Sequence, residues 1–232
     1  MLVHAAGVGI GYFGEHALGV ARRLEQRVPE VFGLSDGILY RRWLPEELRL
    51  TGDDVSRALA GDIAGYVLAR RRSLPVPGDT SLQLSGRNPV WQRSAELMGQ
   101  AFGPGGLMLR PLLDHLSRQL LASEQASIVD GSTNLGRWFK GDSGILKVDF
   151  FERSFSNFDN ACYDAVFDLA GAAVGISDPA WPAMLREAFE FSAEERVSPD
   201  KWLLYRWLQL ERELWVNPCK LSLIHISEPT RQ

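Results

Sequence analysis

The sequence predicts an α+β fold, and three observations point to that class. Several segments place apolar residues at the i, i+3, i+4 spacing of an amphipathic helix. Between them lie two pairs of short β-rich runs, each pair joined by turn-forming residues, Ser35-Asp36-Gly37 and then Lys140-Gly141-Asp142-Ser143. The composition, 45% hydrophobic and 23% charged over 232 residues, is that of an ordinary globular protein.

The helices follow from this spacing in chain order. The first is expected over residues 14–27 and ends before Pro29, and the second is expected over 53–72, where Asp53 or Asp54 can cap the start. Further helices are expected over 90–102, 107–123, 160–174, 182–191 and 199–215.

The strands are expected in two hairpins. The first joins residues 31–34 to 38–43, and the second joins the run 127–139 to 144–150. The segment 73–89 is expected to form a loop, because its prolines and glycines break both the helical and the strand period.

Charge and composition exclude several classes. The formal net charge of -4 provides no positive field for a phosphate backbone, so we expect no nucleic-acid partner. No apolar run approaches the roughly 20 residues that span a bilayer, so we expect no membrane segment. The two cysteines, Cys162 and Cys219, do not form a disulfide framework, and we expect a cytoplasmic protein.

A glycine motif near the start admits two interpretations. The run from Gly9 through Gly11 to Gly14 matches G-x-G-x-x-G before a helix, and Asp36 follows about 20 residues later, as in a dinucleotide-binding fingerprint. A dinucleotide fold also needs further βα crossovers, whereas here the chain turns straight back at Gly37. We therefore favour a flexible turn before a helix and keep a dinucleotide-binding oxidoreductase as the weaker alternative.

A cluster of polar residues lies on the second predicted hairpin and the loop before it. Asp130 and Asn134 lie on the loop, and Asp149 ends the last strand. Phosphoryl transfer from a magnesium nucleotide needs a carboxylate for the acceptor hydroxyl and hard oxygen ligands for Mg²⁺. The alternative is that Asp130 and Asn134 only form a turn before Gly136.

Asp149 and one further aspartate, Asp168, can be weighed by the cost of burying an acid. An acid that closes a buried hairpin costs stability unless it is paired or bound to metal, which favours a functional role for Asp149. Asp168 lies in an apolar helical pattern, and we expect it to be a structural acid that accepts hydrogen bonds from loop backbone N–H groups.

In these residues the chain resembles the kinase-like small-molecule phosphotransferases, the aminoglycoside phosphotransferase and choline kinase superfamily. The resemblance covers most of residues 7–215 and implies a protein-kinase-like fold, with a partial N-lobe over 1–45 and a mostly helical C-lobe over 46–217. It implies that Asp130 is the catalytic aspartate and that Asn134 and Asp149 are metal ligands. The implied cofactors are ATP and Mg²⁺, and the implied partner is a small molecule with a hydroxyl acceptor.

The sequence departs from the family pattern at defined places. The family motif H-G-D-x-x-x-x-N has four residues between acid and amide, whereas three lie between Asp130 and Asn134. The family's nucleotide-binding lysine has no counterpart, because no lysine precedes Lys140. We therefore expect an ATP-dependent phosphotransferase that is N-terminally truncated or has a degenerate ATP-binding lobe and turns over little, with a non-catalytic pseudokinase-like binding module as the alternative.

The end of the chain does not fit what precedes it. Residues 218–232 are expected to be a non-native tail, because the run Ser-Leu-Ile-His-Ile-Ser-Glu-Pro-Thr-Arg resembles translated sequencing-adapter read-through. A frayed native terminus is the alternative.

Overall fold

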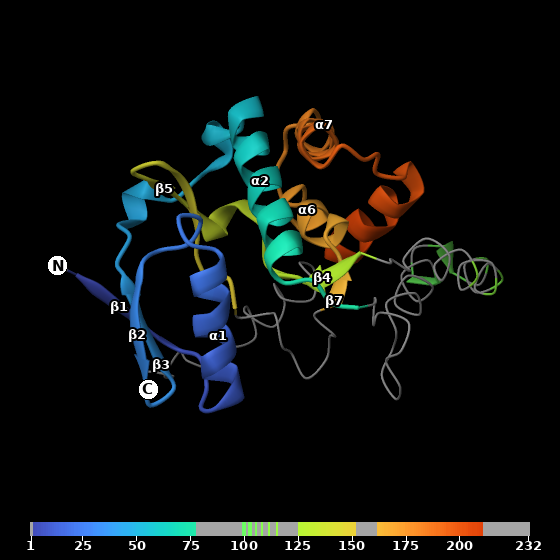
Figure 1. Ribbon diagram of the computed structural model, residues 1–232. Coiled ribbons are helices and arrows are strands. Elements are labelled where there is room, and N and C mark those ends of the chain that lie inside the picture. The colour runs from blue at the N-terminus through green and yellow to red at the C-terminus, as the bar shows by residue number, and fades with distance from the viewer. Residues whose placement is uncertain are drawn as a thin grey trace, which may run out of the picture.

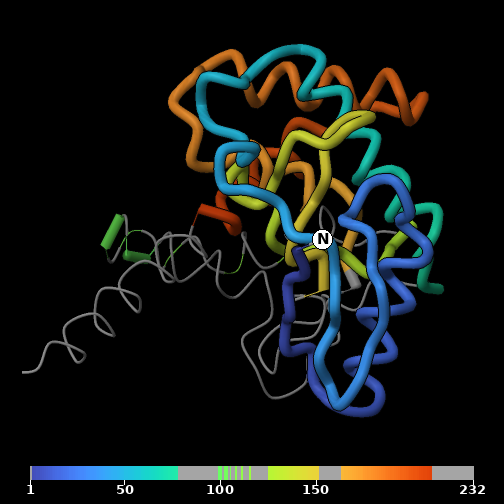
Figure 2. Tube along the Cα trace, turned by 90° about the vertical axis from the view of Figure 1, so that its left-hand side faces the viewer, coloured from blue at the N-terminus to red at the C-terminus, as the bar shows by residue number. Residues whose placement is uncertain are grey.

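We analysed a computed structural model of the chain, which describes residues 2–77, 99–100, 125–151 and 162–210, together with single positions between 102 and 115. An antiparallel sheet with one helix beside it forms one end of the described structure, and a group of helices forms the other (Figures 1 and 2). The described residues also form two small two-stranded sheets.

The sheet has three strands in the order β1-β3-β2. Strand β1 (Val3–Gly7) and strand β2 (Val31–Ser35) each pair antiparallel with the central strand β3 (Ile38–Arg42). Helix α1 (Tyr12–Arg23) packs against β2 and β3 (Figure 1). This confirms the first predicted helix and the first predicted hairpin.

The glycine motif forms the turn from β1 into α1. Gly9 and Gly11 have φ angles of 86° and 64°, in the left-handed region that glycine adopts without a steric penalty. A Cβ at Gly14 would lie 2.7 Å from the carbonyl oxygen of Gly9, so the turn closes tightly onto the helix. Because β1 pairs antiparallel with β3, these strands do not form the parallel unit of a dinucleotide fold. The turn interpretation is confirmed.

Helix α2 (Arg57–Ser73) is the central element of the helical part, and helix α7 (Trp181–Ala193) packs along it (Figure 1). The N-cap of α2 is Ser56, whose hydroxyl oxygen accepts a hydrogen bond from the backbone N–H of Leu59 at 3.2 Å. The prediction that Asp53 or Asp54 caps this helix was wrong. Both lie in the preceding 3-10 turn η2 (Gly52–Asp54), where the Asp54 carboxylate accepts the N–H of Thr51 instead.

The second predicted hairpin is present as β5 (Trp138–Gly141) and β6 (Gly144–Lys147), but its first arm is shorter than the predicted run 127–139 and extends into the predicted turn at Lys140 and Gly141. Strand β4 (Ala126–Ile128) precedes it and pairs antiparallel with β7 (Cys162–Asp164). The helix predicted over 160–174 therefore starts late, as α6 (Val166–Ala172), because the backbone of residues 162–164 is hydrogen-bonded to β4.

Helical structure also covers residues 199–210, which confirms the last predicted helix as far as the described residues extend. Most of the predicted helices 90–102 and 107–123, most of the loop 73–89, and the whole tail 218–232 lie outside the described residues. A boundary between lobes at residue 45 stays a prediction.

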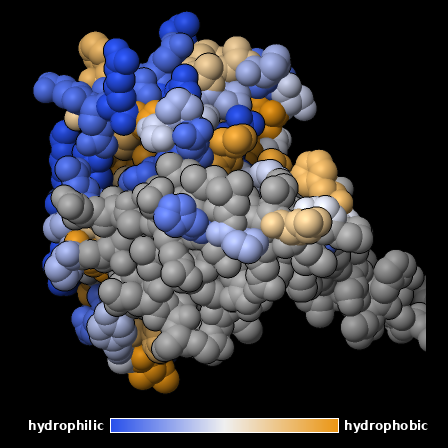
Figure 3. Space-filling view, turned by 90° about the vertical axis from the view of Figure 1, so that its right-hand side faces the viewer, coloured by the Kyte–Doolittle hydropathy of each residue, from blue (hydrophilic) through white to orange (hydrophobic). Residues whose placement is uncertain are grey.

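One hydrophobic cluster joins the two ends of the molecule. It contains Val20 and Leu24 of α1, Leu39 of β3, and buried residues of α2, α6 and α7. Trp138 and Trp181 are its largest fully buried side chains. On the face shown in Figure 3, hydrophilic and hydrophobic side chains are interspersed over the upper part of the molecule. Among the described residues, no helix has both the length and the apolar character to cross a membrane.

Candidate functional site

The loop between β4 and β5, residues 129–137, carries the predicted site residues Asp130 and Asn134 and is hydrogen-bonded to Asp168 of α6. The Asp168 carboxylate accepts the backbone N–H groups of Asp130 at 2.7 Å and Gly131 at 2.8 Å. The Thr133 hydroxyl donates to the Asp168 carbonyl oxygen, and a Cβ at Gly171 would lie only 2.6 Å from that hydroxyl. The expectation that Asp168 is a structural acid is confirmed.

The Asp130 carboxylate lies inside the protein. Its side chain is 0% exposed, and Tyr66 of α2 donates to its Oδ2 at 2.6 Å. Its Oδ1 accepts the Ser132 N–H at 3.1 Å and lies 3.3 Å from Lys147 Nζ, which is also 0% exposed. In this arrangement Asp130 ties the loop to α2 and β6. Its role as catalytic aspartate is not tested by these contacts.

Arg70 of α2 connects the same loop to the end of the hairpin. Its guanidinium is 1% exposed, lies 3.8 Å from Asp130 Oδ2, and donates to three backbone carbonyls. Those carbonyls belong to Ile128, Val129 and Phe150. One buried arginine therefore holds together the segments that precede Asp130 and follow Asp149.

Burial changes the proton affinity of this network. Burial lowers the pKa of Lys147, against the opposing attraction of Asp130. Burial also raises the pKa of Tyr66 well above its usual value, and the Asp130 charge acts in the same direction. The pKa of Asp168 rises to about 6 for the same two reasons. The buried cations Lys147 and Arg70 both lie beside the Asp130 carboxylate, and this pairing makes the burial of these charges tolerable.

Asp149 lies directly beyond the hairpin and is nearer the surface, with 16% of its side chain exposed. Its φ angle of 55° is in the left-handed region, unusual for a residue other than glycine. Arg137 Nη1 forms an ion pair with its Oδ2, and Arg41 Nη2 of strand β3 lies 3.9 Å from its Oδ1. The acid that the sequence singled out is paired, and its partners are guanidinium groups from two separate parts of the chain.

Asn134 lies at the start of the short 3-10 helix η3 (Leu135–Arg137) and is half-buried. Its backbone carbonyl accepts the N–H of Arg137 at 3.0 Å. This turn brings the Arg137 side chain to Asp149. The metal-ligand role of Asn134 stays a prediction.

Strand β1 contributes His4, which lies opposite Arg41 in the β1–β3 register. The imidazole stacks on Trp43 with ring centroids 6.1 Å apart. Burial lowers the pKa of His4, and Arg41 lowers it further, against the attraction of Asp149. Its Nδ1 is buried and has no hydrogen-bond partner among the described residues.

The implied Mg²⁺ can be tested against these residues. Asp149 already pairs with two arginines, and the Asp130 carboxylate is enclosed by Tyr66, Lys147 and a backbone N–H. Within the part of the chain that the structure describes, no group of three His, Cys, Asp or Glu side chains could hold a metal ion. In this structure the carboxylates of Asp130 and Asp149 are thus engaged by protein groups, and the metal-ligand roles of Asn134 and Asp149 stay predictions.

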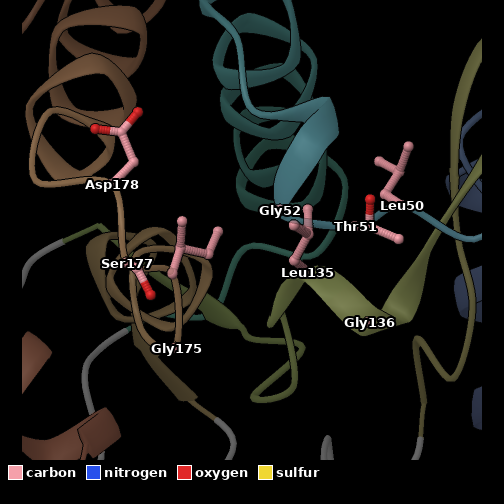
Figure 4. A pocket seen from close by; sticks show the side chains of 9 residues that line it. Leu50, Thr51, Gly52, Leu135, Gly136, Gly175, Ser177 and Asp178 are labelled. Atoms are coloured by element: carbon pink, nitrogen blue, oxygen red, sulfur yellow. The ribbon is translucent and has the colours of Figure 1, made fainter.

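A cavity of 470 Å³ lies beside the loop (Figure 4). Its polar side chains are Thr51, Ser177 and Asp178, and the loop contributes Leu135 and Gly136 to its wall. The Gly136 carbonyl also accepts a hydrogen bond from Arg49 Nη1, which links the segment that contains Leu50 and Thr51 to the loop. The polar side chains in its wall suit a polar small molecule, and Gly136 in that wall directly precedes Arg137 in the chain.

The sequence analysis missed the long-range partners of both acids, Tyr66 and Arg70 for Asp130, and Arg41 and Arg137 for Asp149. One signal was present, because residues Arg41 and Arg42 alternate on a strand and one of them must face inward. Arg41 is the inward one, with only 5% of its surface exposed.

No protein-family model and no curated protein matches the sequence. Among solved structures, a protein from Thermobifida fusca assigned as a fructosamine-3-kinase is 18% identical, with a TM-score of 0.56, over 94% of this chain and 79% of its own. A glucosamine kinase is 17% identical, with a TM-score of 0.53, over 97% and 73%. A glucosamine kinase in complex with glucosamine, ADP and inorganic phosphate is 17% identical, with a TM-score of 0.52, over 90% and 70%. The chain has the kinase-like fold of small-molecule phosphotransferases, as the sequence predicted.

Proposed function

We propose that this chain is a kinase-like phosphotransferase that uses ATP to phosphorylate a hydroxyl group on a small molecule, with low turnover. The observation that carries the proposal is the convergence of three elements on Asp149: the β5–β6 hairpin, the loop through Arg137, and strand β3 through Arg41. In a kinase-like fold the nucleotide phosphates lie between the sheet and such a hairpin end. The solved relatives named above include kinases of glucosamine and, by assignment, fructosamine.

The cavity beside the loop supplies a place for the acceptor. Its wall carries the hydroxyls of Thr51 and Ser177 and the carboxylate of Asp178. Hydroxyl and carboxylate groups suit a polyhydroxylated compound, because each can exchange hydrogen bonds with a substrate hydroxyl. The cavity therefore supports a polar rather than an apolar acceptor.

Low turnover follows from two features of the site. The Asp130 carboxylate is 0% exposed and both of its oxygens are engaged by protein groups, and we expect these contacts to slow any reaction of Asp130 with an acceptor. No lysine precedes residue 140, and the sheet presents Arg41 and His4 beside Asp149 instead. We expect a kcat below about 0.1 s⁻¹, against a median near 10 s⁻¹ for enzymes.

The test is ATP consumption by the full chain against a panel of sugars, aminoglycosides and amino alcohols. Asp178→Asn should raise KM for an accepted substrate with little change in kcat, because it removes a binding charge and leaves the phosphate end of the site intact. Arg57→Gln serves as the control, because the Arg57 side chain is 79% exposed and does not line the cavity. Acceptor-independent hydrolysis alone, equal in both variants, would contradict the proposal.

The burial of Asp130 favours a second candidate, a module that binds nucleotide without turnover. The two candidates differ in one measurement, since the module predicts ATP binding with no acceptor-dependent consumption at any concentration. Nucleotide binding with no phosphorylated product over the whole panel would favour the module.

A further inference from the structure

A second cavity, of 690 Å³, lies where helix α1, strand β2 and the turn between β5 and β6 meet. Four consecutive residues of β2, 31–34, contribute to its wall. It shares no lining residue with the cavity proposed for the acceptor, so the proposed function makes no use of it. Its volume is in the range of small-molecule sites, roughly 300–1,000 Å³.

Much of the wall of this second cavity is apolar. Helix α1 contributes Leu18 and Ala21, strand β2 contributes Val31 and Leu34, and strand β6 contributes Leu146. Ala21 is buried and the four larger side chains are half-buried, so they present apolar surface to the cavity. Such a wall binds the apolar body of a ligand through the hydrophobic effect.

Phe32 lines the cavity at an irregular point of strand β2. The pairing of β2 with β3 shifts register between Val31 and Gly33, which makes Phe32 the extra residue of a β-bulge. Its side chain is left 39% exposed. β2 is an edge strand, and a bulge on an edge strand discourages a further strand from pairing there. The geometry therefore favours a compact small molecule with an apolar or aromatic body over an added peptide strand.

The charged side chains of the cavity carry an excess of negative charge. They are Arg22, Glu25, Glu30, Arg42 and Asp142. Arg42 and Asp142 neutralise one another in an ion pair at 3.0 Å. Among the described residues, neither Glu25 nor Glu30 takes part in an ion pair. Besides the neutral pair, the cavity therefore has two carboxylates against the single guanidinium of Arg22.

We infer that this cavity binds a small organic ammonium compound, with its apolar body against the side chains of α1, β2 and β6 and its ammonium group at Glu25 and Glu30. An ammonium group donates hydrogen bonds and accepts none, so it suits carboxylates that have no cationic partner. An aromatic body suits the exposed ring of Phe32, because two rings gain from stacking or edge-to-face contact.

The experiment is isothermal titration calorimetry of the full chain at pH 7 with tryptamine, and with tryptophol and indole-3-acetate as its neutral and anionic analogues. The three probes share an indole body and end in an ammonium, a hydroxyl and a carboxylate group. We expect the Kd of tryptamine to be about fivefold lower than that of tryptophol, and the Kd of indole-3-acetate to be the highest. The difference between tryptamine and tryptophol should shrink in about 1 M NaCl, because salt screens exposed charges.

Variants test the charged and the apolar part of the cavity separately. Glu25→Gln/Glu30→Gln should raise the Kd of tryptamine about fivefold and leave that of tryptophol unchanged, because it removes charge and keeps side-chain size. The matched control is Glu15→Gln/Glu47→Gln, the same change in net charge at two exposed acids outside the cavity, and it should preserve both Kd values within about twofold. Phe32→Ala should weaken all three probes about equally, since it removes apolar surface and no charge.

Several results would overturn the inference. One is an equal Kd for tryptamine and tryptophol, or a lower Kd for indole-3-acetate than for tryptamine. Another is a preference for tryptamine that survives Glu25→Gln/Glu30→Gln or is lost equally in the control variant. Unchanged binding by Phe32→Ala, with the fold checked by circular dichroism, would place the probes outside this cavity. Absence of saturable tryptamine binding up to about 10 mM would also contradict it. The proposed function does not depend on any of these results, because the two cavities have no lining residue in common.

Discussion

Replacing Lys147 with methionine should destabilise the protein by about 3 kcal/mol. The lysine and its partner Asp130 are both 0% exposed, with Nζ 3.3 Å from Oδ1. Removing one partner of a buried ion pair costs about 3–5 kcal/mol, because the other charge is left buried and uncompensated. Tyr66 and Arg70 remain beside Asp130 and keep the loss near the lower limit. Methionine preserves the length and apolar stem of the side chain.

The matched control is Lys140→Met, which breaks the ion pair between Lys140 and Asp54. That pair is shorter, at 2.6 Å, but its side chains are 56% and 21% exposed. Solvent screens an exposed pair, so the expected loss is below about 1 kcal/mol. Distance alone would rank the control as the stronger pair, whereas burial reverses the order.

The assay is urea unfolding at pH 7, followed by tryptophan fluorescence and far-UV circular dichroism. The double variant Lys147→Met/Asp130→Asn should regain part of the loss, because it also removes the isolated charge. Equal losses for the two single lysine variants would refute the reasoning. So would a double variant no more stable than Lys147→Met, since the penalty would then not come from the unpaired carboxylate.

Three further predictions concern local features. Burial and nearby arginines lower the folded pKa of His16 from 6.5 to about 4. The contribution of His16 to stability is therefore complete above pH 6.5 and is lost as the pH falls towards 4. His16→Asn should give a flatter dependence of the unfolding free energy on pH over that window, measured by urea titrations at stepped pH. Ser56→Ala removes the N-cap of α2 and should cost about 1 kcal/mol in the same unfolding assay, and an unchanged midpoint would contradict the cap assignment. Gly171→Ala should lower the melting temperature, because the added methyl would clash with the Thr133 hydroxyl. Gly61→Ala in α2 should instead raise stability by about 0.5–1 kcal/mol, because a Cβ there would have nothing within 4 Å. Equal shifts for the two variants would refute the contact argument.

Local patterns predicted the elements that depend on spacing and turn chemistry. The hairpin at Asp36 and Gly37 formed where the sequence placed it, and both residues adopt the positive φ angles that their types tolerate. The β5–β6 hairpin formed around its own turn in the same way. A helix or a hairpin is specified by neighbours within a few residues, so the chain order is enough to find it.

Contacts between distant segments could not be predicted in this way. The helix expected from residue 160 gave way to strand β7, because the backbone of residues 162–164 pairs with β4. Which faces meet depends on the packing of the whole chain, and no periodicity in the sequence encodes it.

The candidate site shows the same division between what local sequence predicts and what long-range packing decides. The sequence by itself singled out Asp130, Asn134 and Asp149 on one hairpin and its loop, and it identified Asp168 as the acid that holds the loop. Only the tertiary structure decided which partners these acids have. Tyr66 lies 64 residues before Asp130 in the chain and yet donates to its carboxylate. A carboxylate takes its chemical character from the charges and solvent around it, and those are set by the assembled fold.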